Sequence, residues 1–68
     1  MTADQLRTLL KIHALTYEGF VSELNAFCER EVISERGGKN VVANWMSHKR
    51  NISPPLQFII EQFFRQRA

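Results

Sequence analysis

The sequence predicts an all-α fold of four short helices, with a five-helix arrangement as the alternative. Apolar residues recur every three or four positions along most of the chain, as they do on the buried face of a helix. A double glycine at 37–38 and a double proline at 54–55 divide these stretches, and both are typical of helix boundaries. No stretch shows a sustained alternation of apolar and polar side chains in the manner of a strand, and residues 31–34 come nearest to one. The 68 residues are enough for a single domain.

The first predicted helix covers residues 2–14. Thr2 is a suitable N-cap, and Gln5, three residues later, can complete a capping box. One apolar stripe runs along this helix and consists of Leu6, Leu9, Leu10 and His13. Because His13 lies on that stripe, we expect a partly buried core histidine.

The second predicted helix starts after Thr16, a second candidate N-cap. Its apolar face consists of Tyr17, Phe20, Val21, Leu24, Phe27 and Cys28. The stripe can be extended through Glu31 and Val32 to a stop at residues 36–38. Gly19 costs a helix roughly 1 kcal/mol relative to alanine, so we expect it to mark a close approach to another backbone.

The third predicted helix covers residues 39–48, with Asn40 or Gly38 at its start. Its inward side chains are Val42, Trp45 and Met46. Residues 51–55 connect it to the last helix, where Ser53 can cap and Pro54 is tolerated in the first turn. That helix extends from residue 55 to about residue 65, and its apolar side chains are Leu56, Phe58, Ile59, Ile60, Phe63 and Phe64.

Positive charge is concentrated in the middle of the chain. The net charge is only +2, but residues 1–35 hold three Lys or Arg against six acids. Residues 36–60 contain no acid at all and carry Arg36, Lys39, Lys49 and Arg50. Such an asymmetry favours a polyanionic partner.

Residues 42–64, VANWMSHKRNISPPLQFIIEQFF, resemble the second half of a Cro/repressor-type (XRE-like) helix-turn-helix domain. The matching positions are Val42, Trp45, Lys49, Arg50, Pro54 or Pro55, and Ile59 with Ile60. Two features differ from that family. His48 stands where the family often has glycine, and residues 25–41 are longer than its usual tight turn.

The resemblance implies that residues 39–48 form a recognition helix for the major groove of double-stranded DNA. The candidates for base contacts are Lys39, Asn40, Val41 and Asn44, with Lys39 and both asparagines opposite the apolar face. The candidates for phosphate contacts are Thr16, Tyr17, Ser47, His48, Lys49 and Arg50. Many members of the family bind pseudo-palindromic sites as homodimers, and the dimer interface is expected at Phe58, Phe63 and Phe64.

Simpler explanations compete with these assignments. Asn40 and Asn44 can be a cap and a solvent-facing residue, and Lys49 and Arg50 suit a helix C-terminus. Neither explanation requires the acid-free span at 36–60, which therefore favours DNA. Trp45 is expected in the core rather than at a ligand.

Enzymatic and metal-dependent functions have little support in the sequence. One cysteine, Cys28, and two histidines do not match a structural zinc spacing, and Cys28 on an apolar face is expected to pack rather than react. The segment at 36–39 lacks the spacing of a phosphate-binding loop. We expect no enzyme activity, cofactor, metal ion, membrane span or small-molecule effector.

Two functions remain. The first is a small cytoplasmic DNA-binding transcriptional regulator, a homodimeric repressor of the kind common in phages and mobile elements. The alternative is an α-helical protein-interaction module, such as a phage-type inhibitor or adaptor, that docks through its apolar C-terminal helix.

Overall fold

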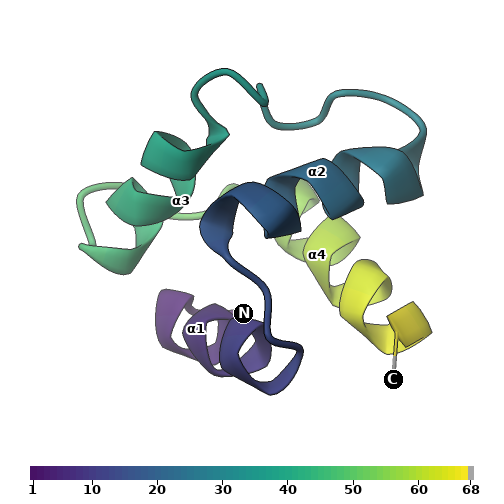
Figure 1. Cartoon of the computed structure of the whole chain (residues 1–68). Coiled ribbons are helices and arrows are strands. Elements are labelled where there is room, and N and C mark those ends of the chain that lie inside the picture. The colour runs from purple at the N-terminus through teal and green to yellow at the C-terminus, as the bar shows by residue number, and fades with distance from the viewer. Residues whose placement is uncertain (68) are drawn as a thin grey trace.

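The computed structural model of the chain describes residues 1–67, and these form four α-helices and no strand. The helices are α1 (Ala3–Ile12), α2 (Tyr17–Cys28), α3 (Gly38–Met46) and α4 (Pro54–Arg67). In Figure 1, α1 lies below α2 and α3, and α4 descends behind α2 toward the C-terminus. The predicted all-α class with four helices is confirmed.

Local capping signals set the starts of the first two helices, as predicted. The Thr2 hydroxyl accepts a hydrogen bond from the Gln5 backbone N–H at 3.2 Å, and Gln5 Oε1 accepts one from the Thr2 N–H at 2.8 Å. The Thr16 hydroxyl accepts from the Gly19 N–H at 2.9 Å. The prediction that Gly19 approaches another backbone is wrong. A Cβ added at Gly19 would instead lie 3.0 Å from the Thr16 hydroxyl oxygen.

All four helices contribute to one core. Its buried side chains include Leu6, Phe20, Leu24, Val42, Trp45, Ile60, Phe63 and Phe64. The predicted core positions of Trp45 and of partly buried His13 are confirmed, and the His13 ring lies 5.1 Å from the Phe64 ring between their centroids. Cys28 is half-buried against this core.

The predicted dimer interface must be corrected at two of its three residues. Phe63 and Phe64 are only 3% and 5% exposed, because both rings pack on Phe20. Their apolar surface is therefore covered by the chain itself. Phe58, in contrast, is 63% exposed on the outer side of α4.

The connection between α2 and α3 is a nine-residue loop, residues 29–37, that arches over the top of the molecule in Figure 1. The extension of α2 through Glu31 and Val32 is therefore wrong. The helix ends at Cys28 because Glu29 adopts the left-handed backbone conformation, with φ of 55°. The sequence also predicts a solvated helix face for the acidic and basic residues at 29–36. These residues are exposed, but they lie on this loop and not on a helix.

A buried asparagine holds this loop in place. Asn25 is 6% exposed, and its Nδ2 donates to the Ile33 carbonyl at 2.8 Å. Its Oδ1 accepts from the backbone N–H groups of Val32 at 2.9 Å and Ile33 at 3.2 Å. These bonds turn the chain back toward α2, where Ile33 is buried and α3 starts against Val21.

Candidate nucleic-acid interface

The start of α3 packs directly on α2 through Gly38. An added Cβ at Gly38 would lie 2.7 Å from Cγ1 and 2.9 Å from Cγ2 of Val21, distances that real Cβ atoms do not adopt. Val42, Trp45 and Met46 continue the same buried face. The opposite face of α3 is thereby turned toward solvent.

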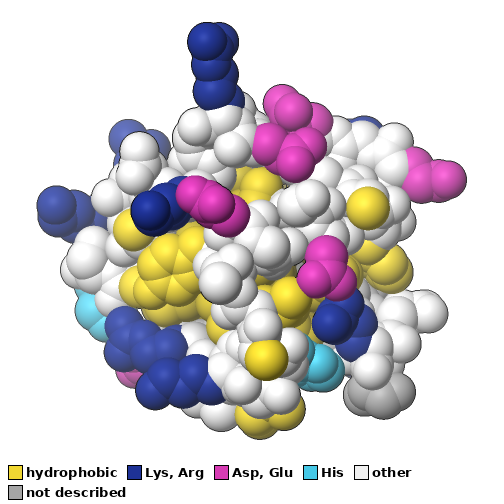
Figure 2. All heavy atoms as spheres, viewed as in Figure 1, with side chains coloured by type: hydrophobic (Ala, Val, Ile, Leu, Met, Phe, Trp, Pro, Cys, Tyr) yellow, Lys and Arg dark blue, Asp and Glu magenta, His cyan; other side chains and the backbone are white. Residues whose placement is uncertain are grey.

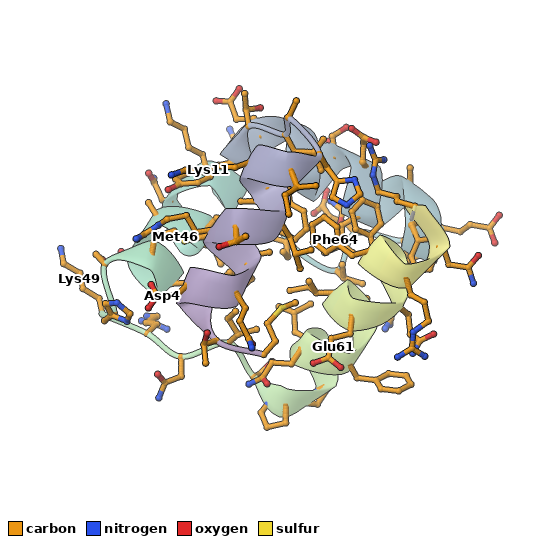
Figure 3. The ribbon with its side chains drawn as sticks, turned by 90° about the horizontal axis from the view of Figure 1, so that it is seen from below. Asp4, Lys11, Met46, Lys49, Glu61 and Phe64 are labelled. Carbon is orange, nitrogen blue, oxygen red and sulfur yellow. The ribbon has the colours of Figure 1, made fainter. Side chains whose placement is uncertain are left out.

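The end of α3 is fixed by α1. The Arg7 guanidinium donates from Nη2 to the Met46 carbonyl at 3.0 Å, where a helix end presents unsatisfied carbonyl groups and negative partial charge. Figure 3 shows Met46 beside α1, with Lys11 and Lys49 on the same side of the molecule. Both ends of α3 are thus held by tertiary contacts.

The turn after α3 exposes three consecutive residues that the sequence predicts as phosphate contacts: His48, Lys49 and Arg50. The backbone N–H groups of Lys49 and Arg50 donate to the Asn44 carbonyl, at 3.0 and 3.3 Å. His48 has a φ of 63°, the left-handed region that favours glycine. In the helix-turn-helix family that residues 42–64 resemble, this position is often glycine.

The solvent-facing ridge of α3 consists of Asn40, Asn44 and Ser47. Successive residues of a helix are separated by about 100° around its axis, so these three lie within a sector of about 60°. That sector points away from Val42 and Trp45. Asn40 and Ser47 are exposed, and Asn44 is half-buried.

The amides on this ridge are not explained by capping. The N-cap of α3 is Gly37, and no side chain caps this helix end, so the expected cap at Asn40 or Gly38 is wrong. Within residues 1–67, neither the Asn40 nor the Asn44 side-chain amide takes part in a hydrogen bond. Both amides therefore keep a free donor and a free acceptor.

Lys39 and Val41 lie on the two flanks of the ridge rather than on it. Each is about 100° around the axis from Asn40, in opposite directions. Lys39 is only about 60° from Val42, so its expected place opposite the apolar face is wrong. Both side chains are nevertheless exposed, Val41 at 36%.

Val41, Asn44 and Arg50 line one groove between α3 and the start of α4, with Trp45 and Leu56 at its apolar side. The structure thus brings two predicted base contacts together with one predicted phosphate contact. Thr16 and Tyr17 do not line this groove.

Thr16 and Tyr17 line a second depression, between α1 and the start of α2, together with Arg7 and Lys11. The Thr16 hydroxyl accepts from Gly19 but retains its own proton as a donor. Arg7 and Lys11 were not among the predicted site residues. Their spacing of four positions places both cations on one side of α1, which is the signal in the sequence that points to them.

The cations of the middle segment are not neutralised by neighbouring acids. Arg36, Lys39, Lys49 and Arg50 are all exposed, and none belongs to an ion pair in the part of the chain that the structure describes. Figure 2 shows Lys and Arg mainly on the half of the molecule that carries α3, and Asp and Glu mainly over the other half. The α3 side therefore presents net positive charge.

Residues 1–67 contain no cluster of three or more side chains suited to a metal ion. None of the helices in this stretch combines the length and the apolar character needed to cross a membrane.

Comparisons of this chain with models of protein families, with curated proteins and with solved structures found no match.

Proposed function

We propose that this protein binds double-stranded DNA sequence-specifically and regulates transcription, with α3 as the helix that enters the major groove. The proposal extends the sequence resemblance to the helix-turn-helix family. In this role the protein acts in the cytoplasm as a repressor of the type found in phages and mobile elements.

The observation that carries the proposal is the outward face of α3. Short polar side chains with free amide groups form its ridge, and exposed cations without acidic partners surround it. Amides read base edges in the major groove, and cations bind phosphate and position the helix. Capping accounts for neither asparagine, because no side chain caps the start of α3.

Two depressions hold further candidate phosphate-binding groups. Lys11, Tyr17 and Arg7 lie at one of them, and Arg50 lies at the other, next to Val41 and Asn44. A helix in the major groove lies between two phosphate backbones, so cations near such a helix fit that ligand.

The protein is proposed to act as a homodimer on a pseudo-palindromic operator. Phe58 is the residue of the predicted interface that remains exposed, and its exposed fraction of 63% is large for a phenylalanine. A two-fold dimer would place the same α4 surface of both copies together and would direct two copies of α3 at two half-sites.

The alternative is docking of a protein partner on the same α4 surface. Exposed Phe58 is the specific observation that favours it. Burial of Phe63 and Phe64 leaves this surface with much less apolar area than the sequence predicts, for a protein partner and for the homodimer alike. Protein docking also gives no role to the free amides of Asn40 and Asn44.

Selection from random double-stranded DNA by the purified protein tests the proposal. At about 0.15 M salt, non-specific electrostatic binding is partly screened. We expect enrichment of an inverted repeat whose spacing reports the distance between the two copies of α3. Recovery of no DNA would contradict the proposal and favour the protein partner.

A further inference from the structure

We infer that Asn40 and Asn44 each read an adenine, so that each half-site contains two A·T pairs about two base-pair steps apart, while Lys39 binds the phosphate backbone. This inference rests on the proposed function and specifies the sequence that the α3 ridge recognises. Lys39, which the sequence analysis predicts as a base contact, is here assigned to the phosphate backbone instead.

The two asparagines have the free groups that adenine requires. An asparagine amide pairs with adenine in the major groove by donating from Nδ2 to N7 and accepting at Oδ1 from the N6 amino group. Such pairing needs both amide atoms, and neither asparagine uses them within residues 1–67. No acid lies in residues 36–60 to repel the phosphates that flank the bases.

The spacing of the two amides sets the spacing of the bases. Asn40 and Asn44 are separated by one helical turn, about 6 Å along the axis. Base pairs are stacked about 3.4 Å apart, so a helix lying along the groove places the two amides about two steps apart. Val41, exposed on the flank nearer Asn44, lies where it can contact a thymine methyl group.

Lys39 has a different geometry. It lies about 100° around α3 from Asn40 and about 140° from Asn44, so it cannot share the groove floor with both. Its long stem extends from an exposed position on the flank, which faces a wall of the groove when the ridge faces its floor. A lysine there acts as a point charge for phosphate.

The test repeats the DNA selection with four variants: Asn40→Ala, Asn44→Ala, Lys39→Ala and Gln66→Ala. Gln66 is an exposed amide on α4 and serves as the control. All four positions lie at the surface or half-exposed, so folding is retained, and circular dichroism verifies this.

We expect the wild-type motif to contain two A·T pairs about two steps apart. Each asparagine variant should lose the preference at one of them, by roughly 5- to 150-fold in affinity ratio. Lys39→Ala should weaken binding to all sequences alike and reduce the dependence of affinity on salt. The control should reproduce the wild-type motif.

The possible failures are distinguishable. A sequence-specific wild-type motif that both asparagine variants reproduce would overturn this inference and leave the proposed function intact. A change of motif in Lys39→Ala would overturn the assignment of Lys39 to phosphate. DNA recovered without any motif would overturn both the adenine reading and the sequence specificity of the proposed function, and would reduce the site to a cationic surface. No recovery of DNA would overturn DNA binding altogether.

Discussion

At the scale of single residues, Gly38 decides how closely α3 can approach α2. Its backbone lies where any side chain would meet both methyl groups of Val21, which is 2% exposed. Valine is stiff at χ1 and has few rotamers to escape into. The exposed ridge of α3 keeps its direction because this contact leaves so little room.

Gly38→Ala should therefore lower the free energy of unfolding, by about 1–2 kcal/mol net of the better helix propensity of alanine. Urea unfolding measures this change. Gly37→Ser is the matched control, because nothing lies within 4 Å of a Cβ at Gly37 and serine is a favoured N-cap. Adding Val21→Ala should cost less in the Gly38→Ala background than in the wild type, and equal costs would show that the clash is not the cause.

His48 holds the turn after α3 in a backbone conformation that is unfavourable for a side chain. Left-handed geometry costs a non-glycine residue about 1–2 kcal/mol, whereas glycine adds about 0.5–1 kcal/mol of backbone entropy cost. His48→Gly should thus stabilise the protein slightly, by about 0.5–1 kcal/mol in thermal or urea unfolding. Lys49→Gly, at a residue without positive φ, should not stabilise it, and a gain there equal to that of His48→Gly would contradict this explanation.

At the scale of elements, local signals in the sequence were sufficient for helix starts but not for every helix end. The Thr2 and Thr16 caps involve partners three residues away, so the sequence reveals them directly. The path of the chain after α2 depends on Asn25, which binds residues seven and eight positions further on. The signal in the sequence for this role was the position of Asn25, a polar residue within the apolar stripe, four positions after Val21.

Some features of the candidate site could likewise be predicted from the sequence, and others depend on tertiary packing. Spacing along the helix was enough to identify the ridge asparagines and the exposed cations after α3. The contacts of Gly38 with Val21 and of Arg7 with the Met46 carbonyl join residues 17 and 39 positions apart. Such contacts exist only once the helices have packed, so sequence patterns alone did not reveal them.

Asn25→Ala should loosen the α2–α3 loop. It leaves the buried Ile33 N–H and carbonyl groups without partners, at a cost of about 1–3 kcal/mol for each such group. Urea unfolding should show this loss, and hydrogen exchange at Val32 and Ile33 should accelerate. Asn44→Ala removes an amide that makes no hydrogen bond within residues 1–67 and should leave both measurements near the wild type. Unchanged exchange in Asn25→Ala would mean that other contacts hold the loop.

At the scale of the whole molecule, one small core supports two surfaces of different chemical character. The α3 side carries the free amides and cations, and the α4 side carries exposed Phe58. Phe63 and Phe64 belong to the core between them, since Phe64 contacts His13 and Phe20. The sequence showed an excess of apolar residues on α4, but their division between core and surface depends on how α4 packs.

Phe58→Asp should dissociate the proposed homodimer without unfolding the protomer. Sedimentation velocity should show a wild-type dimer and a monomeric variant, with the same helical circular dichroism. Phe63→Asp should instead unfold the chain, because it buries a charge in the core. A Phe58→Asp variant that remains dimeric would place the interface elsewhere, and a monomeric wild type would contradict the homodimer.

If the exposed face of α3 meets DNA, NMR of the ¹⁵N-labelled protein titrated with a duplex from the selection will show it residue by residue. We expect the side-chain amide signals of Asn40 and Asn44 to shift most, together with backbone signals of residues 39–50. The signals of Phe58 and its neighbours on α4 should shift much less. Shifts concentrated on α4, with the two asparagine amides unchanged, would contradict the claim.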